Sequence, residues 1–138
     1  MAGYSGTPLV QKLGIKPDHR LLLLGAPEGF DTTLGALPEG VTVRTAARGT
    51  ADVVVLFTAL RALLEARIDT LAAAVFPDGA LWIAWPKRAS KVATDMTEDV
   101  VREVCLPRGL VDNKVCAIDE TWSGLRVVHR LEQRKSSR

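Results

Sequence analysis

Leu21-Leu22-Leu23-Leu24-Gly25-Ala26-Pro27-Glu28-Gly29-Phe30 is the stretch of sequence on which the fold depends. Its run of leucines predicts a strand that is buried on both faces, as in a parallel sheet. A glycine turn follows this strand, and a helical pattern begins at Phe30. In α/β proteins the turn after such a strand is a frequent place for ligands. The stretch therefore predicts a central strand with a candidate ligand site at its carboxyl end.

Strand and helix patterns alternate along the rest of the chain. Strands are predicted over Val41–Arg44, Val53–Phe57, Ala80–Trp85, Lys114–Asp119 and Leu125–Leu131. Helices are predicted after Thr7-Pro8, over Phe30–Leu37, over Leu60–Val75 and after the capping residue Thr97. The last two strands are joined around Ser123-Gly124, which predicts an antiparallel hairpin.

This order predicts a three-layer α/β fold with a mainly parallel sheet of about six strands and an antiparallel hairpin at its end. The whole chain, residues 1–138, is expected to form a single domain. Residues 1–18 supply an amino-terminal helix and turn, and residues 132–138 form a basic tail.

Composition excludes several classes of protein. The net charge of +2 is too small to indicate nucleic-acid binding, and aromatic residues for base stacking make up only 5% of the chain. The sequence contains no apolar run of 18 residues and no signal-peptide pattern, so we expect a cytoplasmic protein without membrane contact. Cys105 and Cys116 lie in apolar patterns, which predicts buried free thiols. No metal-ligand spacing and no catalytic set of residues is recognisable.

The segments Leu21–Phe30, Ala51–Phe57, Asp78–Trp85 and Lys114–Arg130 together resemble the class I, S-adenosylmethionine-dependent methyltransferase fold, which is Rossmann-like. The whole sequence also resembles a family of small bacterial proteins that is known only as a domain of unknown function. The phrases that carry this second resemblance are Tyr4–Leu9, Leu24–Phe30, Trp85-Pro86-Lys87 and Trp122–Arg126. The second resemblance implies no activity.

The methyltransferase resemblance implies a cofactor site at the glycine turn, formed by Gly25, Pro27, Glu28, Gly29 and Phe30. Several of the contacts that it implies are replaced in this chain. Leu22 or Leu23, both apolar, stands where the family has an acidic residue that ends the first strand, and Pro27 replaces a small residue and removes an N–H. Arg44 ends the second strand and Thr45 follows it, whereas the family has at this position an acidic residue that holds the ribose hydroxyls.

The connection from the second strand to the central strand is also short. Seven residues, Thr45–Ala51, separate them, whereas a crossover that contains a helix needs a dozen or more. These residues reach about 23–25 Å when fully extended. The segment therefore either crosses the sheet in extended form, which we favour, or Val41–Arg44 runs antiparallel at an edge. Both alternatives remove the strand and helix that would wall an adenine pocket.

A second candidate site consists of cations that are expected near the carboxyl ends of the strands. Lys87, Arg88 and Lys91 follow the strand Ala80–Trp85, and Arg44 ends the second strand. These side chains could bind an anion such as phosphate.

These observations favour a non-catalytic, methyltransferase-like domain that binds a small anionic ligand or a protein partner and needs no cofactor. One alternative is a minimal methyltransferase that uses S-adenosylmethionine. A second alternative is a nucleic-acid-associated protein that uses the basic loop. An edge strand such as Val41–Arg44 would also allow self-association.

Overall fold

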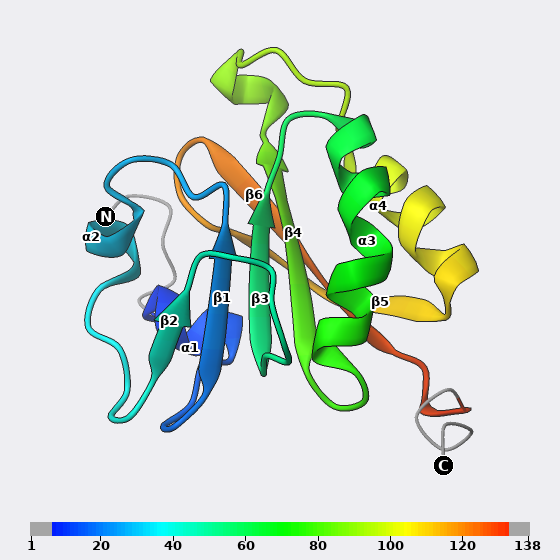
Figure 1. Cartoon of the computed structure of the whole chain (residues 1–138). Helices are drawn as coiled ribbons and strands as arrows, with labels where there is room; N and C mark the ends of the chain where they lie inside the picture. The colour runs from blue at the N-terminus through cyan, green and yellow to red at the C-terminus, as the bar shows by residue number, and fades with distance from the viewer. Residues whose placement is uncertain (1–6, 133–138) are drawn as a thin grey trace.

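The computed structural model describes residues 7–132, which form a six-stranded sheet with helices on both of its faces (Figure 1). The strands are β1 (Arg20–Leu24), β2 (Thr42–Arg44), β3 (Val53–Phe57), β4 (Ala80–Pro86), β5 (Leu110–Ala117) and β6 (Trp122–His129). The helices are α1 (Leu9–Leu13), α2 (Phe30–Leu34), α3 (Arg61–Val75) and α4 (Glu98–Cys105), with 3₁₀ turns η1 (Arg88–Ser90) and η2 (Leu106–Arg108). The predicted order of elements is confirmed. The predicted tail, residues 132–138, lies outside the described residues except for Glu132.

The sheet has the strand order β2-β1-β3-β4-β6-β5. Strands β2, β1, β3 and β4 are parallel, and β6 is antiparallel to both of its neighbours. All residues of β3 and β4 are buried, as expected for central strands that helices cover on both faces. The predicted three-layer, mainly parallel sheet with an antiparallel hairpin is therefore confirmed.

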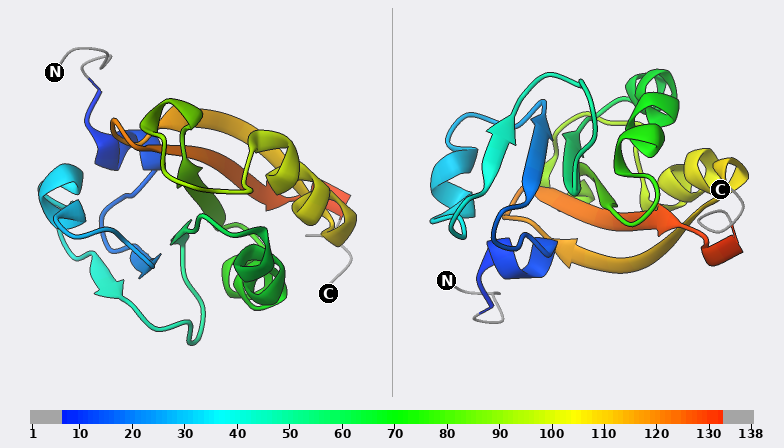
Figure 2. Two further views of the ribbon diagram at one scale, coloured as in Figure 1. Left: turned by 90° about the horizontal axis from the view of Figure 1, so that it is seen from above. Right: turned by 60° about the horizontal axis from the view of Figure 1, so that its bottom comes forward.

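The core has two halves, one on each face of the sheet. Figure 2 shows the helices that cover these faces. Alternate residues of each strand point to opposite faces. Leu22, Val54 and Ile83 pack with α3 and α4, whereas Leu21 and Val55 pack with α1 and α2. Leu22 and Leu24 belong to one half, and Leu21 and Leu23 pack in the other, so the leucine run contributes to the core on both faces of β1.

The second strand runs parallel to β1, with Arg20 opposite Thr42 and Leu22 opposite Arg44. β3 lies on the other side of β1 and starts at the amino edge of the sheet, so the chain has to cross β1 to reach it. It does so without a helix, and Ala47 packs on the α3 side of the core (Figure 1). The extended crossing that we favoured is therefore confirmed, and the antiparallel alternative is wrong.

The hairpin is present, but its predicted bounds are wrong. The turn consists of residues 118–121, and Ser123-Gly124 lie inside β6 rather than in the turn. A Cβ atom at Gly124 would lie 3.0 Å from Cδ1 of Ile118 and 3.1 Å from Cε3 of Trp82 on the neighbouring strand, so a larger residue would fit tightly there. β5 begins earlier than predicted, at Leu110, because the polar residues Asp112, Asn113 and Lys114, with a register shift between Asp112 and Lys114, interrupt the strand pattern after Val111.

Two helix ends agree with the sequence signals. The Thr97 side chain accepts a hydrogen bond from the Val100 N–H group at 3.1 Å, as expected for the cap of α4. Gly14 ends α1 in the left-handed conformation with a φ of 80°. Trp82 Nε1 donates to Leu13 O at 3.0 Å, and this hydrogen bond holds the end of α1 against the sheet.

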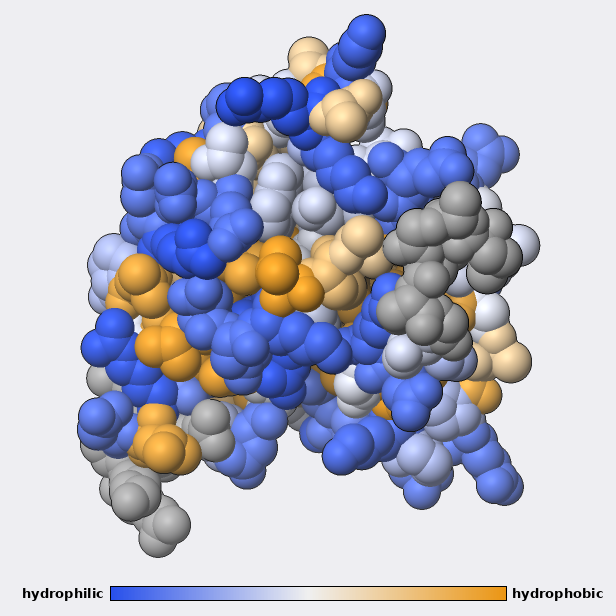
Figure 3. Space-filling model, turned by 180° about the vertical axis from the view of Figure 1, so that it is seen from behind, coloured by the Kyte–Doolittle hydropathy of each residue, from blue (hydrophilic) through white to orange (hydrophobic). Residues whose placement is uncertain are grey.

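The surface shown in Figure 3 is the face behind the view of Figure 1. Hydrophobic side chains break its hydrophilic surface in several patches and do not form one continuous area. Among the described residues, the exposed large hydrophobic side chains are Val43, Leu60, Leu63, Val92, Val115 and Leu131. Val43 lies on the edge strand β2, so self-association through this edge stays a prediction.

Candidate functional site

The glycine turn lies at the carboxyl edge of the sheet, where the strand order diverges. From β1 the chain leads through α2 to β2 on one side, whereas the next strand, β3, lies on the other side. Such a topological switch point leaves a crevice outside the carboxyl ends of the strands, and ligands of open α/β sheets bind there. The sheet topology therefore brings residues 25–30 to the position that the sequence predicted.

Gly25 and Gly29 have different roles in this turn. Gly25 has a φ of +70°, and a Cβ atom there would lie 2.7 Å from the backbone oxygen of Phe57. It is required because the end of β1 packs closely against the end of β3. Gly29 has a φ of +82°, but no atom lies within 4 Å of the position of its Cβ atom. Gly29 therefore leaves open space on the outer side of the turn.

The middle of the turn holds Pro27 and Glu28. Pro27 is partly buried, and its carbonyl oxygen accepts a hydrogen bond from the Phe30 N–H group at 3.1 Å. Glu28 is exposed and supplies a carboxylate within the turn. Pro27 thus shapes the turn, and Glu28 is the charged group that it presents.

An aromatic row lies beneath the turn. The rings of Phe30 and Phe57 meet edge to face with centroids 4.9 Å apart, and those of Phe57 and Trp122 meet in the same way at 5.2 Å. Phe30 and Phe57 are each 3% exposed. Phe30 therefore belongs to the core on the α1 and α2 side, and its ring fills the space behind the turn.

Arg44 is engaged by the chain that follows it. Its Nη1 atom donates to Arg48 O at 2.5 Å, and its Nη2 atom donates to Thr50 O. Its Nε atom is buried and has no partner among the described residues. These bonds hold the extended crossing that returns to β3. Arg44 thus has a structural role that the sequence did not indicate.

The other predicted cations lie on the loop that leaves β4. The Lys87 N–H group donates to Thr121 O at 2.7 Å, which ties the loop to the hairpin turn. Arg88 and Lys91 are exposed on and after η1. Arg44 ends a strand three positions away in the sheet, or about 14 Å at 4.8 Å per strand. The structure gathers the three loop cations but leaves Arg44 apart from them, and their binding of anions or nucleic acid stays a prediction.

The same loop is fastened to the amino terminus of α3. Thr94 Oγ1 donates to Ala59 O at 2.6 Å, and Asp95 Oδ1 accepts from the Arg61 N–H group at 2.7 Å. Asp95 thus caps a helix that begins 34 residues earlier in the sequence. Local spacing could not reveal this cap, because the two groups meet only in the folded chain.

The hairpin turn completes the carboxyl edge. Asp119 Oδ1 accepts the N–H groups of Thr121 and Trp122, both at 2.8 Å. Asp119 therefore lies in the turn and not in the strand that was predicted over Lys114–Asp119, and Glu120 lies in the same turn. Trp122 packs against Phe57 at the rim of the core.

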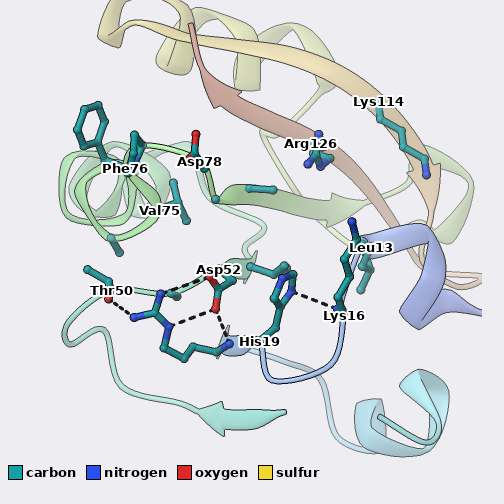
Figure 4. A pocket seen from close by; sticks show the side chains of 18 of the residues that line it. Leu13, Lys16, His19, Thr50, Asp52, Val75, Phe76, Asp78, Lys114 and Arg126 are labelled. Carbon is teal, nitrogen blue, oxygen red and sulfur yellow. Dashed lines mark hydrogen bonds and ion pairs between the residues drawn. The ribbon is translucent and has the colours of Figure 1, made fainter. Parts of the chain in front are cut away.

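A cavity of about 760 Å³ opens at the opposite, amino edge of the sheet (Figure 4). Its wall contains residues from α1, from the starts of β1, β3 and β4, from the end of α3 and from the hairpin strands. Residues 25–30 do not line it. No sequence pattern indicates this cavity, because its lining comes from segments far apart in the chain.

Other chemistry is limited in the part of the chain that the structure describes. No three His, Cys, Asp or Glu residues within residues 7–132 are grouped so that they could hold a metal ion. Cys105 is buried, and burial raises the pKa of its thiol to about 12. Cys116 is only partly buried, in contrast to the prediction for both thiols, and burial raises the pKa of its thiol as well. No helix of residues 7–132 has the length and hydrophobicity to cross a membrane.

Comparison with known proteins supports this architecture. No protein-family model matches the sequence, and no curated protein matches it. Solved structures do match. A SAM-dependent methyltransferase from Aquifex aeolicus aligns over 86% of this chain and 86% of its own, with a TM-score of 0.59 and 14% identity.

Two further structures belong to the same class. The ribosomal protein L11 methylase of Lactobacillus delbrueckii subsp. bulgaricus aligns over 88% of this chain and 75% of its own, with a TM-score of 0.58 and 12% identity. Magnesium protoporphyrin IX methyltransferase of Synechocystis PCC 6803, solved with bound SAM, aligns over 88% and 74%, with a TM-score of 0.56 and 12% identity. The chain therefore has a class I methyltransferase-like α/β fold.

Proposed function

We propose that the chain is a minimal methyltransferase-like domain that binds S-adenosylmethionine, or its demethylated product, at the carboxyl edge of the sheet. The observation that carries this proposal is the position of Gly25–Phe30 at the switch point between β1 and β3. Fold neighbours that include a methyltransferase solved with bound SAM support this function at least as well as the non-catalytic interpretation.

Such a ligand fits this site only if a residue other than Arg44 accepts the hydrogen bonds of its ribose hydroxyls. Arg44 cannot accept hydrogen bonds from ribose hydroxyls, and its guanidinium group is bonded to backbone carbonyls. Glu28 is exposed in the turn and can act as an acceptor. Gly29 leaves room for the ligand to approach the backbone. In this proposal Glu28 replaces the missing carboxylate of the second strand.

Titration calorimetry with S-adenosylmethionine and its demethylated product tests the proposal. We expect saturable binding, because the turn keeps its position and its open outer side. Glu28→Gln should weaken this binding about tenfold, as expected for the loss of a charge-assisted hydrogen bond. Glu39→Gln, which changes another exposed carboxylate, is the matched control and should bind like the wild type. Binding that is equal in the two variants would rule out the role of Glu28.

A non-catalytic binding domain is the second candidate. The observation that favours it is the aromatic row of Phe30, Phe57 and Trp122, which fills the space behind the turn. Such a domain would bind a small anionic ligand or a protein partner without transferring a methyl group. If neither S-adenosylmethionine nor its product binds, this candidate replaces the first one.

A further inference from the structure

The cavity at the amino edge has an unusual excess of positive charge. Its wall contains five cationic side chains and two carboxylates: Lys12, Lys16, Arg20, Lys114, Arg126, Asp52 and Asp78. Its volume of about 760 Å³ falls in the range of small-molecule sites. Because the lining comes from both ends of the chain and from its middle, the site exists only in the folded protein.

Asp52, one of the two carboxylates, is paired with Arg20 and does not neutralise the other cationic side chains. Asp52 Oδ2 accepts the Arg20 N–H group at 2.7 Å and Arg20 Nε at 3.2 Å. Arg20 Nη1 in turn donates to Thr50 Oγ1 at 2.5 Å. This pair closes one side of the cavity and is neutral as a unit. The excess positive charge therefore comes from the other side chains.

Two of the remaining cationic side chains, Lys16 and Lys114, lie on the α1 side of the cavity, whereas Arg126 lies nearer its middle (Figure 4). Lys114 Nζ donates to Lys12 O at 3.1 Å, which holds its ammonium group at the end of this helix. The Lys16 N–H group donates to His19 Nδ1 at 3.1 Å, which fixes the orientation of this ring in the cavity wall. The Lys16 side chain itself is exposed. This wall therefore presents ammonium groups.

The opposite wall is formed by the end of α3 and the turn that follows it. Figure 4 shows Val75, Phe76 and Asp78 on this side, across from Lys16 and Lys114. Val75 is buried in the core. Phe76, whose ring packs edge to face on His129, is partly exposed, and Pro77 is exposed, so these two residues supply the apolar surface of this wall. Asp78 supplies a carboxylate at the rim. The cavity thus has a cationic side and an apolar side.

We propose that this cavity binds an organic phosphate. The phosphate would lie against Lys16 and Lys114, and the body of the ligand would lie against Phe76 and Pro77. A phosphate group has three terminal oxygens and can use several donors at once, whereas a carboxylate has two oxygens. The site does not depend on the function proposed above. It lies at the other end of strand β1, which has five residues, or about 16 Å at 3.3 Å per residue.

Phenyl phosphate is a suitable probe, because it joins an aromatic body to a phosphate and contains no adenosyl group. We expect saturable binding at low salt in titration calorimetry, and weaker binding of inorganic phosphate. Lys16→Glu should weaken the binding of phenyl phosphate at least about tenfold, since it removes a charge-assisted contact and adds repulsion. Arg67→Glu changes the net charge equally on the exposed surface of α3 and should have little effect.

Three results would overturn the inference. They are the absence of saturable binding, equal losses in Lys16→Glu and Arg67→Glu, and equal affinities for phenyl phosphate and inorganic phosphate. Thermal unfolding of each variant checks that it folds, and Lys16→Ala should give a smaller loss in the same direction. Binding of S-adenosylmethionine should be unchanged in Lys16→Glu, so this site and the carboxyl-edge site fail or succeed separately.

Discussion

Substitution of each glycine of the turn by alanine should have a different effect on stability. Gly25 lies where the end of β1 packs closely on β3, whereas Gly29 faces open space. Both residues have positive φ values, +70° for Gly25 and +82° for Gly29. An alanine in this region costs roughly 1–2 kcal/mol of backbone strain. At Gly25 the added Cβ would also lie 2.7 Å from Phe57 O, which belongs to the central strand and cannot move freely.

The magnitudes follow from these two terms. Overpacking of a rigid site costs about 1–3 kcal/mol, so Gly25→Ala should lower the free energy of unfolding by about 2–5 kcal/mol. Gly29→Ala meets no atom within 4 Å and should cost only the strain, about 1–2 kcal/mol. A small protein has a stability of about 5–15 kcal/mol, so both variants should still fold.

Urea unfolding followed by circular dichroism measures this difference. With a slope of about 2 kcal/mol/M, the midpoint should fall by about 1–2.5 M for Gly25→Ala and by less than about 1 M for Gly29→Ala. Equal losses, or a larger loss for Gly29→Ala, would refute the close approach of the β1 turn to β3.

Three further predictions concern other parts of the fold. Hydrogen bonding to Arg20 lowers the pKa of Asp52. The Asp52 carboxylate therefore stabilises the protein at pH values above the usual carboxyl pKa of about 3.9. This stabilisation is lost as the pH falls through the lower pKa that Asp52 has in the folded state. The stability difference between wild type and Asp52→Asn should therefore shrink from about pH 7 to about pH 2 in urea titrations, and a constant difference would contradict it. The buried Cys105 thiol, with its pKa of about 12, should resist a thiol reagent at neutral pH until the protein unfolds, and rapid labelling of the native protein would show otherwise. Thr97→Ala should cost about 1 kcal/mol because the cap of α4 is lost, whereas Thr70→Ala on the exposed side of α3 should cost less, and equal losses would exclude the cap.

The sequence was sufficient for elements whose pattern is local. The strand Val53–Phe57 and the capping residue Thr97 were predicted as observed, because an apolar run and a capping signal depend on near neighbours. The hairpin turn was misplaced because glycine indicates turns. Gly124 instead makes room for Trp82 on another strand, and no local pattern reveals such a contact.

The candidate sites likewise include features that a local sequence pattern predicts and features that depend on the folded chain. The glycine turn was found from the sequence because it follows a buried strand directly. The engagement of Arg44 by Arg48 and Thr50 depends on the path of the crossing, which only the structure gives. The amino-edge cavity joins residues as distant as Lys16 and Lys114, so no motif spacing could indicate it.

Calorimetric titration of the wild-type protein with S-adenosylmethionine tests the proposed binding site at Gly25–Phe30. We expect saturable binding that Glu28→Gln weakens and Glu39→Gln leaves unchanged. If neither S-adenosylmethionine nor its demethylated product binds to the folded protein, the methyltransferase-like site at Gly25–Phe30 is contradicted.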